Sequence, residues 1–474
     1  MSKNLNGWFF LSLIISLFVL IPIITVFSSF FDDTSNYYVI LKETFLIEYI
    51  INSSILLFFV LLLTFLLGTG TAYLVSFYNF PLSNFFKWAL ILSFAVPPYI
   101  YAYSLTAFFE NYGTAYTILK SLFGDNNYNQ NIPKFDGMFG AILSITFSLY
   151  AYVYILARAS FLYQSQNLIE LGKNLGFSKF KSFYKIILPA ARPAIVAGLS
   201  LVAMETLAEF GAVDFFSINT LTTGIYNSWI AFDDLAFANR LSFFLLIFIF
   251  ALFIIENFSR KNAKYHFNNR GGFKQKEKFK LSGSNSFFAF IFCFFVFFMS
   301  FLFPLSQMLY WTIKFPENFF DLQIFDLLMN TLYLVVLSSF ILIIFSLVSN
   351  YGNRVSNNKI LNIFSTLSIS GYAIPGVILA IAFISFIAWF DESVVKSLGL
   401  YSIKKIFIGS ILGLVMVYFI RFYSLAFNGI KSGYEKINIS VDESSYLLGY
   451  SKRKTFTNIH IPFLRNSLLF VCIL

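Results

Sequence analysis

The chain has 474 residues, of which 58% are hydrophobic and 12% charged, and its mean hydropathy is +0.74. Because a soluble domain carries roughly a quarter charged residues, this composition excludes an ordinary soluble protein. The net charge of +10 does not indicate a nucleic-acid partner, since the basic residues stand between apolar runs, a pattern that reports membrane orientation. The two cysteines have no CxxC spacing and the two histidines are far apart, so no disulfide framework or metal cluster is expected.

Apolar runs long enough to cross a bilayer as helices follow one another along the whole chain, which predicts an all-α polytopic membrane protein. The first series of expected spans lies near 8–30, 49–78, 88–110, 138–162, 190–211 and 240–258, and the second near 286–311, 327–350, 361–390, 406–427 and from 463 onward. The first run lacks a clear small-residue cleavage site and predicts a retained anchor. An N-terminus in the cytoplasm places most Lys and Arg inside, as the positive-inside rule requires of a multi-pass protein.

A polar, basic segment, "SRKNAKYHFNNRGGFKQKEKFK" (residues 259–280), separates the two series of spans. We interpret it as a cytoplasmic linker, with binding of anionic phospholipid as the alternative role. The predicted organisation is a first helix and external loop (1–47), a first transmembrane domain (48–258), the basic linker (259–285), a helix and external loop that open the second half (286–326), and a second transmembrane domain (327–474).

Two polar stretches repeat with identical spacing. Glu170, Gly176, Ile186 and Pro189 recur 273 positions later as Glu443, Gly449, Ile459 and Pro462. Upstream, Asn52 and Asn330 open corresponding spans, and Pro98 and Pro375 fall in corresponding spans. The chain therefore reads as a tandem duplication, whose halves we expect to pack about a pseudo-two-fold axis with the pathway between them. The repeat also implies that about 55 to 70 residues follow Leu474 in the complete protein.

Each polar stretch predicts a helix–turn–helix at the cytoplasmic surface. In the first copy Leu168, Leu171 and Leu175 share one helical face. Gly176 can adopt a positive φ and end that helix, and Pro189 suits the first turn of the next membrane helix. A projecting helix with an unburied apolar stripe is a candidate docking element, and a helix resting on lipid is the alternative.

The doubled stretch resembles the EAA loop of ABC-importer permeases. Glu, Gly, Ile and Pro are kept, whereas Leu171–Gly172 and Ser444–Ser445 stand where the family often has two alanines. The resemblance implies tandem type I importer domains, with about 12 helices in the complete protein and the last incomplete here. It also implies that each loop docks on a cytoplasmic ATPase, with Glu170 and Glu443 in contact with it and the two glycines forming the turns.

The segment from Met204 to Ile230, with "ETLAEFGAV" and "TTGIY", resembles the fused ferric iron permeases. That resemblance implies a non-catalytic subunit of the bacterial inner membrane that receives iron from an external binding protein. The chain has no GxxxxGK[ST] loop, so we expect no cofactor in it, with ATP and magnesium bound by the partner. Thiamine, a polyamine or an oxyanion remains an alternative substrate, and a secondary transporter driven by an ion gradient is the alternative class.

Three acids mark a candidate substrate path at the end of the fifth span. Glu205 and Glu209 are four residues apart, on one helical face, and Asp214 follows. Carboxylates suit hard trivalent iron, whereas capping of nearby backbone is the alternative role. The tyrosines at 99, 101 and 103 are interpreted as an interfacial belt, and Arg158 and Arg421 as anchors at the inner ends of corresponding spans.

Overall fold

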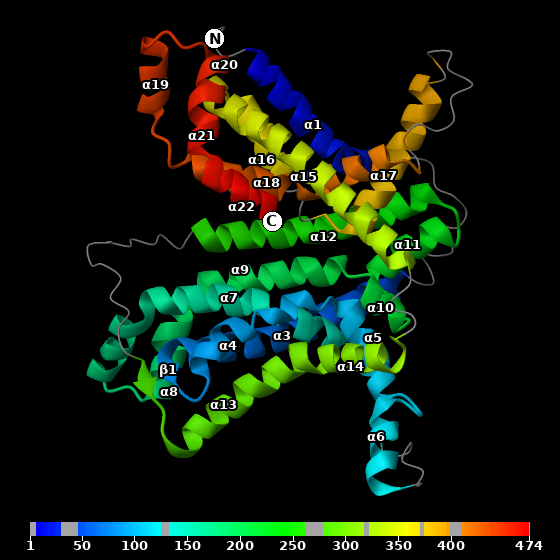
Figure 1. Ribbon diagram of the computed structural model, residues 1–474, viewed down its shortest axis with the longest axis vertical. Coiled ribbons are helices and arrows are strands. Elements are labelled where there is room, and N and C mark those ends of the chain that lie inside the picture. The colour runs from blue at the N-terminus through cyan, green and yellow to red at the C-terminus, as the bar shows by residue number, and fades with distance from the viewer. Residues whose placement is uncertain are drawn as a thin grey trace. The chain divides into compact units, whose positions relative to one another are not determined.

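The computed structural model describes residues 6–29, 46–124, 132–261, 278–316, 322–369, 374–395, 397, 407 and 409–473. Helices make up almost all of the described chain (Figure 1). Within these ranges eight helices are long and apolar enough to cross a membrane, and a ninth candidate is a bent pair. The expectation of an all-α polytopic membrane protein is confirmed.

The helices fall into two compact units, and each is described by itself. The first-copy unit comprises residues 36–227 and 244–319. Its elements are α3 (Leu46–Phe77), β1 (Tyr78–Asn79), α4 (Ser83–Ala89), α5 (Pro98–Phe109), α6 (Thr114–Phe123), α7 (Gly137–Asn174), α8 (Lys179–Ser182), α9 (Leu188–Ala208), α10 (Gly211–Phe215), most of α11 (Leu221–Ile230), the later part of α12 (Leu235–Lys261), β2 (Phe279–Lys280), α13 (Gly283–Phe297) and α14 (Phe303–Lys314).

The core of the first-copy unit is built around α7, which packs along both α3 and α9 (Figure 1). Glycines permit the close approach: a Cβ added at Gly68 would lie 2.7 Å from the Val153 side chain, and one at Gly198 would lie 2.9 Å from the Val153 backbone. Small residues at helix crossings are the usual solution in membranes, because lipid supplies no hydrophobic drive between helices.

The second-copy unit comprises residues 1–35, 228–243 and 320–474. Its elements are α1 (Gly7–Ser28), α15 (Leu322–Ser356), α16 (Lys359–Ile369), α17 (Gly376–Phe390), α18 (Ile411–Tyr434), α19 (Ile439–Leu447), α20 (Lys452–Thr455), α21 (Ile461–Phe463) and α22 (Arg465–Ile473). The long helices α15 and α18 pack together, as their counterparts α3 and α7 do in the first copy.

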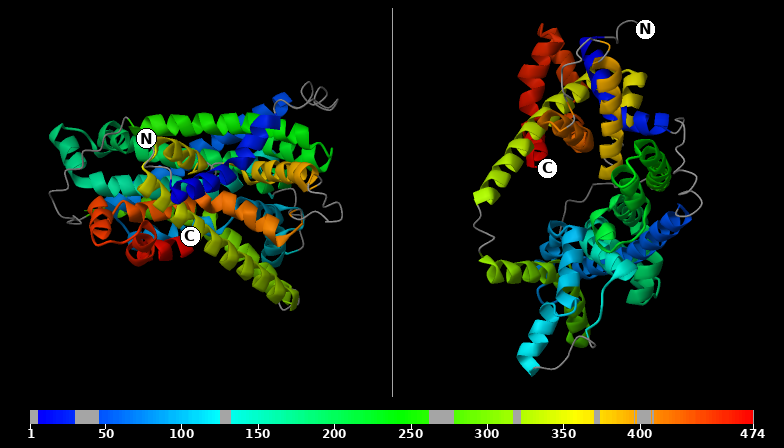
Figure 2. Two further views of the ribbon diagram at one scale, coloured as in Figure 1. Left: turned by 90° about the horizontal axis from the view of Figure 1, so that it is seen from above. Right: turned by 90° about the vertical axis from the view of Figure 1, so that its right-hand side faces the viewer.

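The opening helix of each half packs with the other half's repeat. Helix α1 lies against α15, α16 and α17, as the blue, yellow and orange ribbons of Figure 2 show. Conversely, α13 and α14 belong to the unit built from the first repeat, where α13 contacts α4 and α14 contacts α5. The two halves have therefore exchanged their first helices.

Two of the predicted spans are broken. In place of one span at 88–110, the segments Ser83–Ala95 and Pro98–Phe123 meet at an angle of 92°. The single span expected at 361–390 is two helices, α16 and α17. Pro97 and Pro375 each precede the second helix with extended backbone (ψ 149° and 141°), a conformation that proline favours and that ends a preceding helix. Pro97, the neighbour of Pro98, therefore holds the position in the first copy that Pro375 holds in the second.

Candidate functional site

Both repeated loops turn at their glycines as predicted. Gly176 has φ +71° and Gly449 has φ +79°. In each copy the amide after the glycine donates to the carbonyl five residues earlier, Phe177 to Gly172 at 2.9 Å and Tyr450 to Ser445 at 3.1 Å. This bond is the mark of a helix that ends at a left-handed residue, which glycine adopts without strain.

The segment after each turn is also the same in both copies. Ser178 and Ser451 open α8 and α20, and each hydroxyl accepts a hydrogen bond from the amide three residues on. A five-residue π-helical stretch follows in each copy, 183–187 in the first and 456–460 in the second. Pro189 and Pro462 then lie in the first turn of the next helix, as predicted.

The second residue of the small-residue pair, Gly172 in the first copy and Ser445 in the second, lies where little space is left for a side chain. Gly172 lies against Ser182, and a Cβ at residue 172 would overlap the Ser182 hydroxyl. In the second copy Ser445 donates or accepts a 2.6 Å hydrogen bond with Thr455, the counterpart of Ser182. The position before it, Leu171, has a side chain outside the described residues. In both copies the second position of the pair therefore lies at the contact between the helix before the turn and the short helix after it.

The tips of the loops present apolar side chains. Leu448 is 77% exposed and its counterpart Leu175 is 56% exposed, each directly before the glycine, and Leu447 is 88% exposed. Glu443 is exposed on α19, and the side chain of Glu170 lies outside the described residues. Ile186 and Ile459 are half-buried behind the tips. An exposed leucine beside a rigid turn is a surface suited to a partner's groove.

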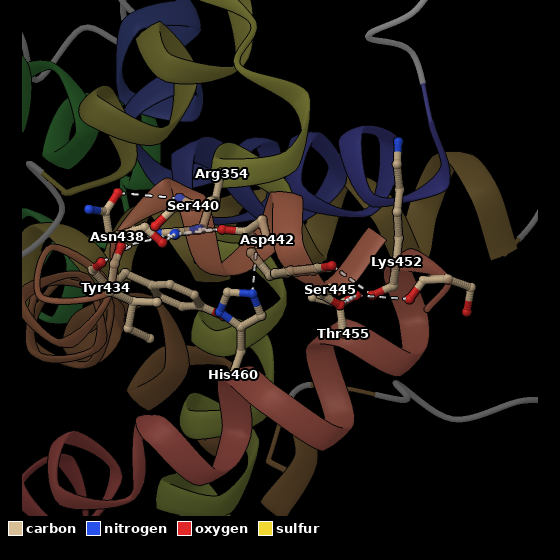
Figure 3. A network of polar contacts seen from close by, with 12 residues as sticks. Arg354, Tyr434, Asn438, Ser440, Asp442, Ser445, Lys452, Thr455 and His460 are labelled. Carbon is tan, nitrogen blue, oxygen red and sulfur yellow. Dashed lines mark hydrogen bonds and ion pairs between the residues drawn. The ribbon is translucent and has the colours of Figure 1, made fainter. Parts of the chain in front are cut away.

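The second loop carries a polar network around Arg354, Asp442 and His460 (Figure 3). Arg354 at the end of α15 donates to Asp442 at 2.6 and 2.9 Å, and His460 approaches the other carboxylate oxygen at 2.9 Å. Arg354 also donates to the carbonyls of Tyr434, Ile437 and Asn438. These bonds span the break between α18 and α19, whereas α7 continues unbroken to Asn174.

Burial favours the neutral form of His460. His460 is fully buried, and its Nδ1 has no hydrogen-bond partner in the described part of the chain. Burial lowers the pKa of His460, an effect that the Asp442 carboxylate opposes and that Arg354 reinforces. The neutral imidazole, with Nε2–H donated to Asp442, is therefore the favoured form. The sequence counterparts of Arg354, Asp442 and His460 are Ser76, Ile169 and Ile187, which cannot form such a network.

The acids of the candidate substrate path do not share one helical face. Helix α9 ends at Ala208, and Glu209 has extended backbone. Its carboxylate turns back to accept the Ala212 amide at 2.8 Å at the start of α10, the capping role that was the alternative. Burial raises the pKa of Glu209, opposed by the Ala212 amide and reinforced by Glu205. Asp214 lies on α10 with an exposed side chain.

Asp214 contributes instead to a cavity of about 360 Å³. Tyr99 and Tyr103 on α5 line it, together with Phe215 and Met308. Tyr101, by contrast, is fully buried and stacks on Phe147, so the three tyrosines are not one interfacial belt. The cavity therefore combines phenol and carboxylate oxygens, the donors that hard cations prefer. Among the described residues, no group of three or more His, Cys, Asp or Glu side chains could hold a metal ion.

Sequence reasoning missed how the segment after α10 is anchored. Asn52 on α3 donates to the Asn219 carbonyl at 2.9 Å, and Ser53 accepts the Leu221 amide at 3.0 Å. Thr222 donates to the Glu209 carbonyl at 2.9 Å. Asn52, which recurs as Asn330 in the second copy, was the sequence feature that could have indicated this contact. Thr222 of the "TTG" motif thus ties α11 to the backbone of Glu209, whereas Thr223 donates to the Ile218 carbonyl.

Arg421 is also placed differently from the prediction. It lies ten residues into α18, not at an inner end, and donates to the Ile374 carbonyl just before Pro375. An arginine bonded to the broken backbone at this point satisfies a carbonyl that the helix break leaves open.

Known proteins resemble this chain over different extents. Residues 64–264 match the family described as binding-protein-dependent transport system inner membrane component. An Fe(3+)-transport system permease protein of Haemophilus influenzae is 22% identical over 403 residues, which is 84% of this chain and 72% of that protein. The sulfate transport system permease protein CysT of Escherichia coli is 26% identical over 159 residues, 32% of this chain and 53% of that protein. A probable transport system permease protein, NifC, of Clostridium pasteurianum is 28% identical over 205 residues, 42% of this chain and 68% of that protein.

Proposed function

We propose that the chain is a multi-pass permease subunit that imports ferric iron with energy from a separate ATPase, since residues 64–264 match the inner membrane component of binding-protein-dependent transport systems. The observation that carries this proposal is the doubled loop, with a left-handed glycine, a matching helix end and an exposed leucine in both copies. Two such loops on one chain suit two ATPase subunits.

The substrate assignment rests on how much of the chain each relative matches and on the charge beside one cavity. The ferric iron permease aligns with both halves of this chain, whereas the sulfate and NifC permeases align with less than half of it. Asp214, Tyr99 and Tyr103 line one cavity, and the Glu209 carboxylate lies beside Gly211, which lines the same cavity. These groups repel an oxyanion such as sulfate and favour a hard cation.

The chain itself would perform no covalent chemistry. ATP and magnesium would be bound by the partner, and an external binding protein would deliver the iron. With the N-terminus in the cytoplasm, both loops would face the ATPases, and Glu170 and Glu443 would contact them. Closure of the ATPases on ATP would move the two loops, and hydrolysis would release them.

Uptake measurements test the proposal. Cells carrying or lacking the full-length gene would be compared for uptake of radiolabelled ferric iron, with sulfate, thiamine and a polyamine in parallel. We expect only iron uptake to fall in the deletion strain and to return with the gene. Loss of sulfate, thiamine or polyamine uptake alone would keep the importer assignment and overturn the iron assignment.

A further inference from the structure

Four basic side chains gather at one end of the first-copy unit. Lys87 lies in the last turn of α4, Arg158 on α7, and Lys278 and Lys280 at β2. The end is the one that bears the first loop, because Tyr73 near the end of α3 contacts Phe183 of the loop, with ring centroids 4.2 Å apart.

The cluster comes from three elements, α4, α7 and β2, which direct contacts hold in place. Parallel pairing of Tyr78 with Phe279 fixes β2 beside the end of α3, and the Lys278 ammonium donates to the Val75 carbonyl. One turn before Arg158, the Tyr154 hydroxyl donates to the Lys87 carbonyl at 3.2 Å and so fixes α7 beside α4. Burial, followed by the charges of Lys87 and Arg158, lowers the pKa of Lys278 to about 8.

Among the side chains that the structure describes, no acid lies beside this cluster. Arg158 Nε is buried and makes no hydrogen bond within the described ranges. The first-copy unit's acids with described side chains lie at the opposite end, at the starts of α3 and α7, after α5, and at or beyond the end of α9: Glu48, Glu110, Asp136, Glu205, Glu209 and Asp214. Partly buried cations without a counter-charge are costly, and a bound anion would remove that cost.

The surroundings of the cluster suit a membrane interface. Trp88, the residue after Lys87, is 72% exposed. Tryptophan is enriched at the level of lipid headgroups, where one side of the indole is apolar and the N–H is wet. Basic residues at this level attract anionic lipid.

We propose that Lys87, Arg158 and Lys278, with Lys280 at the rim, form a binding site for a phosphate-bearing anion, either the headgroup of an anionic phospholipid or free phosphate. The Arg158 guanidinium would offer a planar fork to two phosphate oxygens, and the lysines would act as point charges. The site is independent of the imported substrate.

The test uses the full chain purified in a neutral detergent. Binding is measured from the rise in the thermal unfolding midpoint during titration with phosphatidylglycerol micelles, phosphatidylcholine micelles or inorganic phosphate. The variants are Arg158→Gln, Lys278→Gln and the charge-conserving Lys278→Arg. Lys314→Gln is the matched control, since it removes one exposed cation at the end of α14 in the same unit.

We expect phosphatidylglycerol to bind, Arg158→Gln and Lys278→Gln to weaken it about tenfold, and Lys278→Arg and Lys314→Gln to bind as the parent does. If phosphatidylglycerol binds and inorganic phosphate does not, the ligand is a lipid headgroup. If both bind and the variants weaken both in the same way, the site recognises the phosphate group itself. The proposal is overturned if phosphatidylcholine binds equally, if neither anion binds, or if Lys314→Gln weakens binding as much as Lys278→Gln does.

Discussion

Two glycines, Gly176 and Gly449, decide the shape of the loops at the scale of single residues. Both have left-handed backbone, and both have open space where a Cβ would be. The obstacle to another residue is therefore backbone strain and not a clash. For a residue with a Cβ, the left-handed conformation costs about 1–2 kcal/mol.

We expect the double variant Gly176→Val, Gly449→Val to reach the membrane but to uncouple transport from ATP hydrolysis. The strain would displace the exposed leucines at the tips and weaken docking of the ATPase. ATPase activity and uptake would be measured together in the reconstituted complex. Gly376→Ala is the control, because Gly376 has open space and no left-handed backbone. Normal coupling in the double variant would contradict a docking role for the loops.

The turns at these glycines could be predicted from sequence, because the end of a helix depends mainly on the residues next to it. The prediction that Glu205 and Glu209 share one helical face failed for a different reason. The helix ends at Ala208, where the chain turns, and Glu209 accepts an amide at the start of α10. Nothing in the spacing distinguishes a helix face from a cap that begins one residue after the helix ends.

At the scale of elements, a polar network fixes the break between α18 and α19 in the second loop. Arg354, Asp442 and His460 come from α15, α19 and the π-helical stretch after α20, and they meet in one buried network (Figure 3). Their distance in sequence hides the network, and the repeat misleads further, since the first copy has Ser76, Ile169 and Ile187 instead. The broken spans were missed because both of their halves are apolar.

We expect the stability of the protein to fall as the pH is lowered through and below about 6.5, the ordinary pKa of histidine. The unfolded chain takes up a proton there, whereas buried His460 remains neutral to lower pH, so the stabilisation present above pH 6.5 is lost on acidification. Asp442, Arg354, Tyr351 and Tyr434 are the charged or titratable groups that face it.

The measurement is the thermal unfolding midpoint at pH 7.5 and at pH 5.5. His460→Gln is the comparison, since glutamine can still donate to Asp442 but does not titrate in this range. We expect the parent to lose more stability than the variant between the two pH values. An equal loss in both would remove His460 as the cause.

At the scale of the whole molecule, each compact unit contains helices from both sides of the basic linker. Helix α1 belongs with the second repeat, and α13 and α14 belong with the first. The duplication was readable from sequence, because both copies keep their spacing. The exchange of the first helices could not be predicted from sequence, because an apolar helix has no sequence feature that indicates which bundle it packs with.

We expect a chain cut between Gly271 and Gly272, at an inserted protease site, to stay together in mild detergent. Both fragments would supply helices to both units, so separation would require unpacking α1 from α15 and α13 from α4. Co-elution in size-exclusion chromatography is the measurement, and a denaturing detergent is the control that separates the fragments. Separation in mild detergent would contradict the exchanged arrangement.

The exchange has a consequence for assembly. In a permease with one copy per chain and the same arrangement, the exchanged helix would come from a second polypeptide, which is a domain-swapped dimer. Such a dimer forms at a rate that depends on how much protein is present. Joining the copies through residues 259–280 turns the swap into an event within one molecule, at a local concentration set by the linker. A chain joined in this way can complete both bundles even when the cell makes very few copies of it.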